Sequence, residues 1–268
     1  MTRALTAFAL STVFLAGAPA QVPVPGTARV EWTVGGVKRE ALVAAPAAAK
    51  ATPSPLVFAF HGHGGTAKFA ARSFDYQTAW PEAVVVYPQG VPTPGQLTDP
   101  EGKKSGWQAA AGDHGDRDLK FFDELLKKVK ADHKIDDKRI YCTGHSNGGG
   151  FTYLLWANRG DVFAAVAPSA AAARYAADLK PKPCLHVTGE ADPLVRPAMQ
   201  KRPTDAVKKV NGCEATGKEW AKGGDLVGTI YESKGRTPFV ALVGPGTHAF
   251  PAEAPKLIVK FFKEHEKK

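Results

Sequence analysis

Cysteine is scarce in this sequence: the 268 residues include three, Cys142, Cys184 and Cys213. No two of them have the short spacing of a zinc or iron–sulfur motif, so neither kind of site is indicated. Long hydrophobic runs are also missing after the first twenty residues. A membrane-spanning helix needs about 20 consecutive apolar residues, so we expect none in the rest of the chain.

Acidic residues are outnumbered by basic ones: 26 Asp and Glu against 35 Lys and Arg give a formal net charge of +9 at pH 7. The lysines are dispersed, and they are not interleaved with aromatic residues on which bases could stack. The pattern therefore argues against nucleic acid as a partner. It indicates a soluble surface that is biased towards positive charge.

The first twenty residues differ in character from the others. Arg3 supplies a positive start, an apolar run follows, and Ala18-Pro19-Ala20 has the small-x-small form of a cleavage site. Secretory signal peptides combine these features, whereas an uncleaved membrane anchor would need a longer apolar run. We therefore expect a secreted or periplasmic protein, with residues 1–20 removed and residues 21–268 forming one domain.

Export makes a disulfide possible. Cys142 lies in an apolar segment that predicts a buried strand, where a thiol is inert. Cys184 and Cys213 are therefore the candidate pair, and one of the three cysteines stays free.

Apolar runs alternate with helical patterns along the rest of the chain. Residues 28–46 alternate apolar and polar side chains around Gly35-Gly36, which predicts an antiparallel hairpin. Residues 116–133 and 254–268 have the apolar spacing of amphipathic helices. Continuous apolar runs predict buried strands in "SPLVFAFHGHGG", "EAVVVYPQG", "KRIYCTGHS", "VFAAVAPSA", "PCLHVTGEAD" and "TPFVALVGPGTH". The pattern is typical of an α/β protein with a mainly parallel sheet, helices on both faces and the hairpin at one edge. Residues 91–113, rich in Pro and Gly, should form a long surface loop.

The segment from Gly144 to Gly150 reads "GHSNGGG" and places several glycines where a helix should begin. Each glycine there costs about 1 kcal/mol relative to alanine, so the cluster needs a reason. A nucleophile elbow supplies one, because its sharp strand-to-helix turn exposes a serine, here Ser146, and brings backbones close together. G-x-S-x-G alone is a weak signal, and a plain Gly-rich turn is the alternative. The apolar strand before the motif and the apolar helix after it favour the elbow, with the Asn147 N–H facing developing negative charge.

A serine nucleophile needs a base, and the base needs an orienting acid. In such folds the chain order is Ser, acid, His. Asp192 follows one predicted strand, and His248 follows the last one, as the only histidine in a late loop after a strand. Glu190 is the alternative acid, and Asp192 could also be a helix cap or turn residue. The Asp-Pro sequence starting a turn favours Asp192.

The glycines of "HGHGG", residues 61–65, allow backbone N–H groups to approach a ligand closely. In an elbow enzyme the second oxyanion donor comes from such a loop. We expect the N–H of His63 in this role, with Gly64 as the alternative. No Gly-Lys-Ser/Thr follows, so a phosphate loop is not indicated.

The motifs "HGHGG", "YPQG", "SGW", "GHSNGGG", "FAAVAPSA", "GEADPLV", "NGC" and "GTHAF" occur here in one order and spacing. In this the chain resembles the secreted polyhydroxybutyrate depolymerase / feruloyl esterase group, from about Pro55 to the C-terminus. The resemblance implies an α/β-hydrolase fold, a triad of Ser146, Asp192 and His248, and a structural role for Asp118. His63 stands where many relatives have Cys or Gly. The sequence "GTHAFP" lacks the Trp that often follows the His in relatives. Because this position belongs to the substrate wall, the resemblance does not decide between polymeric and small esters.

The expected function is therefore hydrolysis of a carboxylic ester, small or polymeric, by a monomer acting through an acyl-enzyme. This mechanism requires no metal and no organic cofactor, and we expect none. Polyester, feruloyl and acetyl esters are the substrates considered. A serine peptidase with the same triad and a non-catalytic binding protein of this fold are the alternatives. Trp107, Tyr87 and Phe250 are candidates to contact the substrate, although core packing is the favoured explanation for each of them taken singly.

Overall fold

The computed structural model describes residues 24–173 and 179–268. The expected signal peptide, residues 1–20, lies outside the described residues. Within them, the strands are β1 (Ala28–Val34), β2 (Val37–Ala44), β3 (Ser54–Phe60), β4 (Val84–Pro88), β5 (Val91–Pro92), β6 (Ser105–Gly106), β7 (Ile135–His145), β8 (Ala165–Ser169), β9 (Cys184–Gly189), β10 (Lys218–Gly223), β11 (Leu226–Tyr231) and β12 (Phe239–Gly244).

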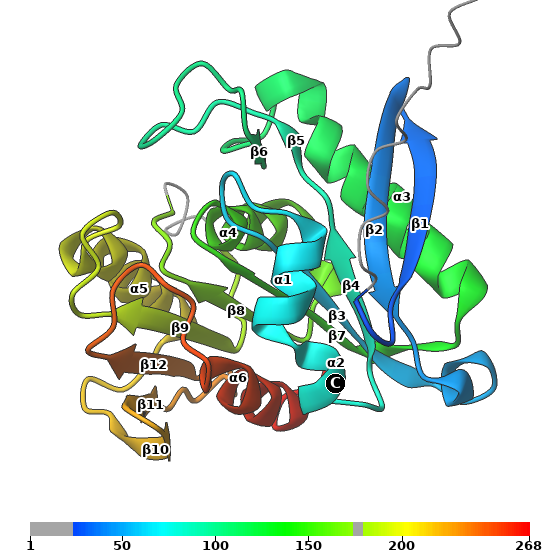
Figure 1. Cartoon of the computed structure of the whole chain (residues 1–268). Coiled ribbons are helices and arrows are strands. Elements are labelled where there is room, and N and C mark those ends of the chain that lie inside the picture. Colours follow the sequence, from blue (N-terminus) through cyan, green and yellow to red (C-terminus); the bar gives the residue numbers. More distant parts are fainter. Residues whose placement is uncertain (1–23, 174–178) are drawn as a thin grey trace, which may run out of the picture.

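Ten of these strands form one twisted sheet in the described part of the chain, in the order β1-β2-β4-β3-β7-β8-β9-β12-β11-β10 (Figure 1). The six strands from β4 to β12 pair in parallel. Strands β3, β4 and β8 are buried along their whole length, which explains why their sequences are continuous apolar runs. The predicted mainly parallel sheet is confirmed.

Antiparallel strands close the sheet at both edges. The β1–β2 hairpin turns at Gly35-Gly36 and joins the sheet through β4, as the sequence predicts. At the other edge, β11 pairs antiparallel with both β12 and β10. The sequence analysis did not predict β10 and β11, because their half-exposed residues carry no continuous apolar run.

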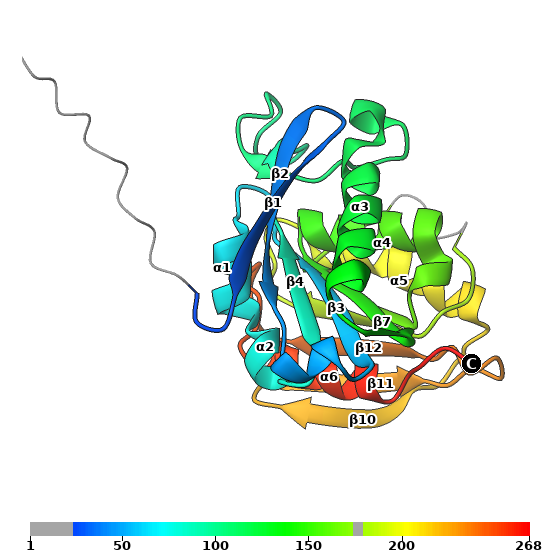
Figure 2. The ribbon, with the colours of Figure 1, turned by 90° about the vertical axis from the view of Figure 1, so that its right-hand side faces the viewer.

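Helices cover both faces of the sheet (Figure 2). The helices are α1 (Ala67–Phe74), α2 (Tyr76–Ala79), α3 (Arg117–Asp132), α4 (Asn147–Arg159), α5 (Pro197–Asn211) and α6 (Ala254–Lys263), with short 3₁₀ turns at Ala47–Lys50, Asp113–Asp116 and Gly160–Val162. One core layer lies under α3, α4 and α5, and the other under α1, α2 and α6. The two predicted helices are present, but α6 ends at Lys263, before the charged tail.

A buried ion pair ties β2 to α3. Arg39 Nη2 lies 2.8 Å from Asp118 Oδ1, and both side chains are almost completely buried. The second carboxylate oxygen of Asp118 accepts a hydrogen bond from the Gln108 N–H at 2.9 Å. These contacts give Asp118 the structural role that the resemblance implies, because they join β2, the segment at Gln108 and the start of α3.

Candidate active site

Ser146 lies at the sharp turn between β7 and α4. Its backbone has φ 57° and ψ −120°, in the region that residues other than glycine rarely adopt. A strained conformation of this kind persists only where the surrounding structure enforces it, and it is a frequent mark of functional sites. The turn places the serine at the C-terminal end of a central parallel strand, where loops of this fold class gather.

Close backbone contacts explain most of the glycines around Ser146. A Cβ atom on Gly148 would lie 2.2 Å from the Phe60 carbonyl oxygen, and one on Gly144 would lie 2.4 Å from the Gly148 carbonyl oxygen. A Cβ on Gly149 would lie 2.7 Å from the Ala171 Cβ. Gly150 is different, because the nearest atom to its Cβ position is 3.7 Å away. Three of the four glycines are thus required by packing, and Gly150 is not.

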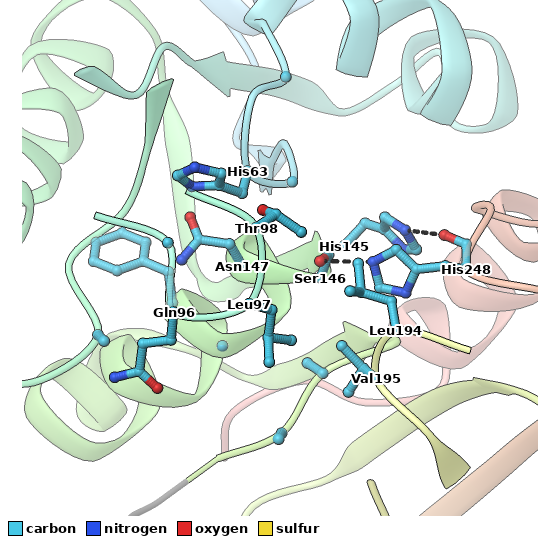
Figure 3. Close-up of a pocket in the computed structure, with 18 of the residues that line it drawn as sticks. His63, Gln96, Leu97, Thr98, His145, Ser146, Asn147, Leu194, Val195 and His248 are labelled. Carbon is cyan, nitrogen blue, oxygen red and sulfur yellow. Dashed lines mark hydrogen bonds between the residues drawn. The ribbon is translucent and has the colours of Figure 1, made fainter. Parts of the chain in front are cut away.

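Ser146, His248 and Asp192 form a hydrogen-bonded chain. His248 Nε2 lies 2.8 Å from Ser146 Oγ, and His248 Nδ1 lies 2.8 Å from Asp192 Oδ2. Figure 3 shows the contact between the serine and the imidazole. The three residues follow β7, β9 and β12, whose C-terminal ends meet at one edge of the sheet. In this arrangement an imidazole that donates from Nδ1 to the carboxylate has Nε2 free to accept the serine proton.

The Asp192 carboxylate is held rigidly. Its side chain is completely buried, and Oδ1 accepts hydrogen bonds from the N–H groups of Leu194 and Val195 at 2.9 Å each. Gln200 Nε2 lies 3.4 Å from Oδ2. Glu190, the alternative acid, is exposed at the surface. The carboxylate that reaches His248 is therefore that of Asp192.

Three other histidines near the site are buried and fully engaged. Burial lowers the pKa of His61, His145 and His186 to about 4, so all three are neutral at pH 7. His145 donates from Nε2 to the His248 carbonyl at 2.8 Å, which fixes the loop that carries the base. His61 accepts the Gly90 N–H at 2.9 Å. These rings support the backbone around the site and have no nitrogen directed at Ser146.

Backbone N–H groups beside Ser146 differ in their hydrogen bonding. The Gly64 N–H donates to the Ser105 carbonyl at 2.7 Å, so it is already occupied. The His63 N–H has no hydrogen-bond partner among the described residues. Asn147 is the first residue of α4, where the N–H has no acceptor within the helix. The N–H groups of His63 and Asn147 are therefore available to bind an oxyanion, whereas that of Gly64 is not.

The ring of His63 connects residues 61–65 to the loop between β5 and β6. His63 Nε2 lies 3.1 Å from Asp99 Oδ2, which also accepts the Lys104 N–H at 2.8 Å. The loop between β5 and β6 is thereby fastened to the His63 segment.

A pocket of about 900 Å³ opens beside Ser146. Its walls come from α1, the β5–β6 loop, α4 and the segment from Leu194 to Pro203. Figure 3 shows Leu97, Leu194 and Val195 around the space next to Ser146 and His248, with Gln96 farther out along the loop. Most of the exposed lining is apolar, which suits the acyl or alcohol part of an organic substrate.

Solved structures share this architecture. The structure entitled acetyl xylan esterase from Aspergillus awamori superposes with a TM-score of 0.64 at 14% sequence identity, over 88% of this chain and 99% of that one. The central parallel sheet, the strained serine turn and this superposition agree. The chain has the α/β-hydrolase fold.

Sequence relatives of this α/β-hydrolase chain are esterases and a depolymerase. Feruloyl esterase D of Neurospora crassa is 30% identical over 138 residues, covering 51% of this chain and 46% of that protein. Poly(3-hydroxyalkanoate) depolymerase C of Paucimonas lemoignei is 26% identical over 238 residues, covering 75% of this chain and 56% of that protein. The profile of the prolyl oligopeptidase family matches residues 101–180. The predicted resemblance is confirmed, although the chain spans less than half the length of the first curated relatives it matches.

Two of the three substrate-contact candidates are wrong. Trp107 and Tyr87 are completely buried, and neither lines the pocket. Trp107 stacks on Phe151, and the Tyr87 hydroxyl donates to Gln77 Oε1 at 2.5 Å. An aromatic residue in or before a loop can anchor that loop to the core, and the sequence pattern does not separate this role from surface exposure. Phe250 is half-buried and does line the pocket.

Sequence analysis missed most of the residues that form the pocket walls. Among the described residues these include Phe69, Leu97, Leu194, Val195 and Met199. Leu194 and Val195 follow the acid in "ADPLV" after one intervening proline, and this closeness in sequence was the one usable signal. The others come from segments that only the tertiary structure brings together.

The predicted Cys184–Cys213 disulfide is not formed in the structure, where all three cysteines are free thiols. Cys184 is completely buried at the start of β9, and Cys213 is half-buried after α5, bridged through its backbone to Ser233. Burial raises the pKa of the Cys184 thiol, with the nearby Cys213 as a smaller cause. Counting cysteines identifies a candidate pair, but it gives no information on whether the side chains meet with disulfide geometry.

Membrane-spanning helices and groups of metal ligands are both absent from the residues that the structure describes. No helix within them is long and apolar enough to cross a membrane. No group of three or more His, Cys, Asp or Glu residues within them is arranged to hold a metal ion.

Proposed function

We propose that this chain is a serine carboxylic ester hydrolase that acts through an acyl-enzyme. The observation that carries the proposal is the Ser146–His248–Asp192 chain, with both hydrogen bonds at 2.8 Å, at the wall of a mostly apolar pocket. A feruloyl esterase and a poly(3-hydroxyalkanoate) depolymerase among the relatives support ester hydrolysis.

In the proposed mechanism His248 accepts the Ser146 proton while Oγ attacks the ester carbonyl. The N–H groups of His63 and Asn147 stabilise the oxyanion of the tetrahedral intermediate. The C–O bond to the alcohol then breaks, and His248 returns the proton to the leaving oxygen. Water repeats these steps on the acyl-enzyme and releases the carboxylic acid. Asp192 keeps the imidazole in the correct tautomer throughout.

The names of the relatives suggest feruloyl, acetyl and hydroxyalkanoate polyester substrates for testing. The proposal further includes export, on the basis of residues 1–20, and a single catalytic domain from residue 21 that acts as a monomer. Export is tested by N-terminal sequencing of the protein from the periplasm or medium, which should begin near Gln21. The mass in solution tests the oligomeric state.

Peptide hydrolysis is the second candidate, because the prolyl oligopeptidase family profile matches the segment around Ser146. The chemistry differs only in the leaving group, an amine instead of an alcohol, so the hydrogen-bonded chain serves either reaction. Matched ester and anilide substrates with the same acyl group separate the two. Turnover of the anilide at a rate similar to that of the ester would favour the peptidase.

A fluorophosphonate probe tests the nucleophile directly. The wild-type protein should be labelled at Ser146 and should hydrolyse p-nitrophenyl esters. Ser146→Ala should lose the label and at least about a thousandfold of the turnover. Ser73→Ala is the matched control, because Ser73 also lines the pocket but lies on α1, whereas the imidazole of His248 is hydrogen-bonded to Ser146. Equal labelling of Ser146→Ala and the wild type would refute the proposal, as would loss of activity in Ser73→Ala alone.

A further inference from the structure

The charges around the pocket are of one sign. The lining, as the described residues form it, contains Lys104 and Arg202 and no Asp or Glu. Lys104 lies beside residues 61–65, and its side chain passes 3.4 Å from the Cβ position of Gly64. Arg202 lies on α5 with Ala198 and Met199, which are spaced to share one helix face with it.

Arg202 is not neutralised by a neighbouring carboxylate. It is exposed and forms no ion pair with any residue that the structure describes. The acid nearest to it on α5 is Asp205, whose carboxylate is paired with Lys201 and with Lys208 at 3.2 Å. The guanidinium is therefore available to an anion that enters the pocket, and its fork of N–H groups fits a carboxylate.

The lining of the pocket also includes exposed apolar side chains. Phe69 is 62% exposed, Leu97 55% and Met199 39%, and all three line the pocket. They come from α1, the β5–β6 loop and α5. Exposed large apolar residues that gather at one opening mark a binding surface. An amphipathic ligand, apolar along its length and anionic at its end, would satisfy both sets of residues.

We propose that Arg202 forms an anion subsite of this pocket, so that esters with a carboxylate at the far end of an apolar acyl chain are preferred. The inference rests on the proposed esterase function. The apolar walls around Leu194 and Val195 contact the chain, and Arg202 pairs with the terminal carboxylate at the pocket mouth. Because the subsite is exposed to water, the preference should be moderate and should weaken with salt.

Two p-nitrophenyl esters with eight-carbon acyl chains test the subsite: mono-p-nitrophenyl suberate, which ends in a carboxylate, and neutral p-nitrophenyl octanoate. Arg202→Gln should lower kcat/KM for the suberate about three- to tenfold and leave the octanoate value unchanged. Lys201→Gln is the matched control, because Lys201 is the preceding residue on α5, pairs with Asp205 and does not line the pocket. In 0.5 M NaCl the wild type should lose most of its preference for the suberate.

The outcomes separate this inference from the proposed function. If wild type hydrolyses both esters, and Arg202→Gln changes neither value or both equally, the anion subsite is refuted while the esterase stands. If neither ester is hydrolysed, the esterase proposal fails. The anion subsite is then tested by measuring the binding of suberate calorimetrically. Weaker binding to Arg202→Gln than to wild type and Lys201→Gln would support it. Equal binding to all three proteins would overturn it.

Discussion

The side chain of Asn147 holds the backbone of Trp107 through two hydrogen bonds. Its Oδ1 accepts the Trp107 N–H at 2.7 Å, and its Nδ2 donates to the Trp107 carbonyl at 3.1 Å. The indole of Trp107 in turn donates to the His61 carbonyl at 2.8 Å. The residue next to Ser146 thus joins the serine turn, the β6 segment and the His61 segment. A change that removes these hydrogen bonds is expected to displace both proposed oxyanion donors, the N–H groups of His63 and Asn147.

Trp107→Ala should therefore act on stability and on all substrates together. The side chain is completely buried between Phe60 and Phe151, and removing a buried tryptophan costs about 3–5 kcal/mol. Chemical denaturation should show this loss, with kcat lowered alike for acetate and aromatic esters. Phe250→Ala is the comparison, because Phe250 is half-buried and lines the pocket. It should raise KM selectively for bulky acyl groups. A stable Trp107→Ala variant with altered selectivity would contradict the packing role.

Asp192→Asn should lower kcat by several orders of magnitude and leave the melting temperature nearly unchanged. The amide has the shape of the carboxylate, but it can present a donor to His248 Nδ1 and so stabilise the wrong tautomer. Glu190→Gln serves as the control, since Glu190 is two residues away and exposed. Its turnover should stay within about twofold of the wild type. A larger loss in Glu190→Gln than in Asp192→Asn would transfer the acid role to Glu190.

Two glycine variants test whether backbone contact shapes the serine turn. Gly148→Ala would place a Cβ 2.2 Å from the Phe60 carbonyl oxygen, so either strand β3 or helix α4 must move. The variant should be strongly destabilised, or fold with little activity. Gly150→Ala meets nothing closer than 3.7 Å and lies within α4, where alanine is favoured by up to about 1 kcal/mol. Its thermal stability should be equal or higher. Equal stability of the two variants would show that the contact at Gly148 is not limiting.

Stability should fall as the pH decreases from about 6.5 to about 4. Burial lowers the pKa of His61, His145 and His186 to about 4 in the folded state, whereas unfolded histidine titrates near 6.5. The unfolded chain therefore binds more protons in this window, and each histidine removes up to about 1.4 kcal/mol per pH unit. Above pH 6.5 these groups have no effect. Urea midpoints measured from pH 7.5 to pH 4.5 should show the decline.

Replacement of single histidines identifies the source of that decline. His186 accepts from the Tyr153 hydroxyl at 2.9 Å and contacts Gln200 Oε1 at 3.0 Å, and a glutamine can make both kinds of hydrogen bond. His186→Gln should therefore flatten the pH dependence. His114→Gln should not change it, because His114 is exposed. A midpoint independent of pH between 6.5 and 5 in the wild type would contradict the assignment.

The amino-acid sequence by itself determined the buried parallel strands, helix α3 and the order of the candidate catalytic residues. Continuous apolar runs specified the buried strands, and the spacing in residues 116–133 specified α3, because burial on one or two faces imposes a local period. The order of Ser146, Asp192 and His248 after three such strands was also readable, since parallel strands deliver their following loops to one edge. The glycines around Ser146 indicated a close backbone approach before the approaching carbonyls were known.

The tertiary structure alone decided which side chains face the pocket. Trp107 and Phe250 have similar aromatic character, yet one is packed against Phe151 and the other lines the opening. Cys184 and Cys213 were the candidate disulfide pair in the sequence, and both are free thiols in the structure. Leu97 of the β5–β6 loop lines the same pocket as Met199 and Arg202 of α5, although these two segments are far apart along the chain. Local sequence fixes the periodicity of burial, but the direction of a loop side chain depends on contacts between distant segments, which have no local pattern.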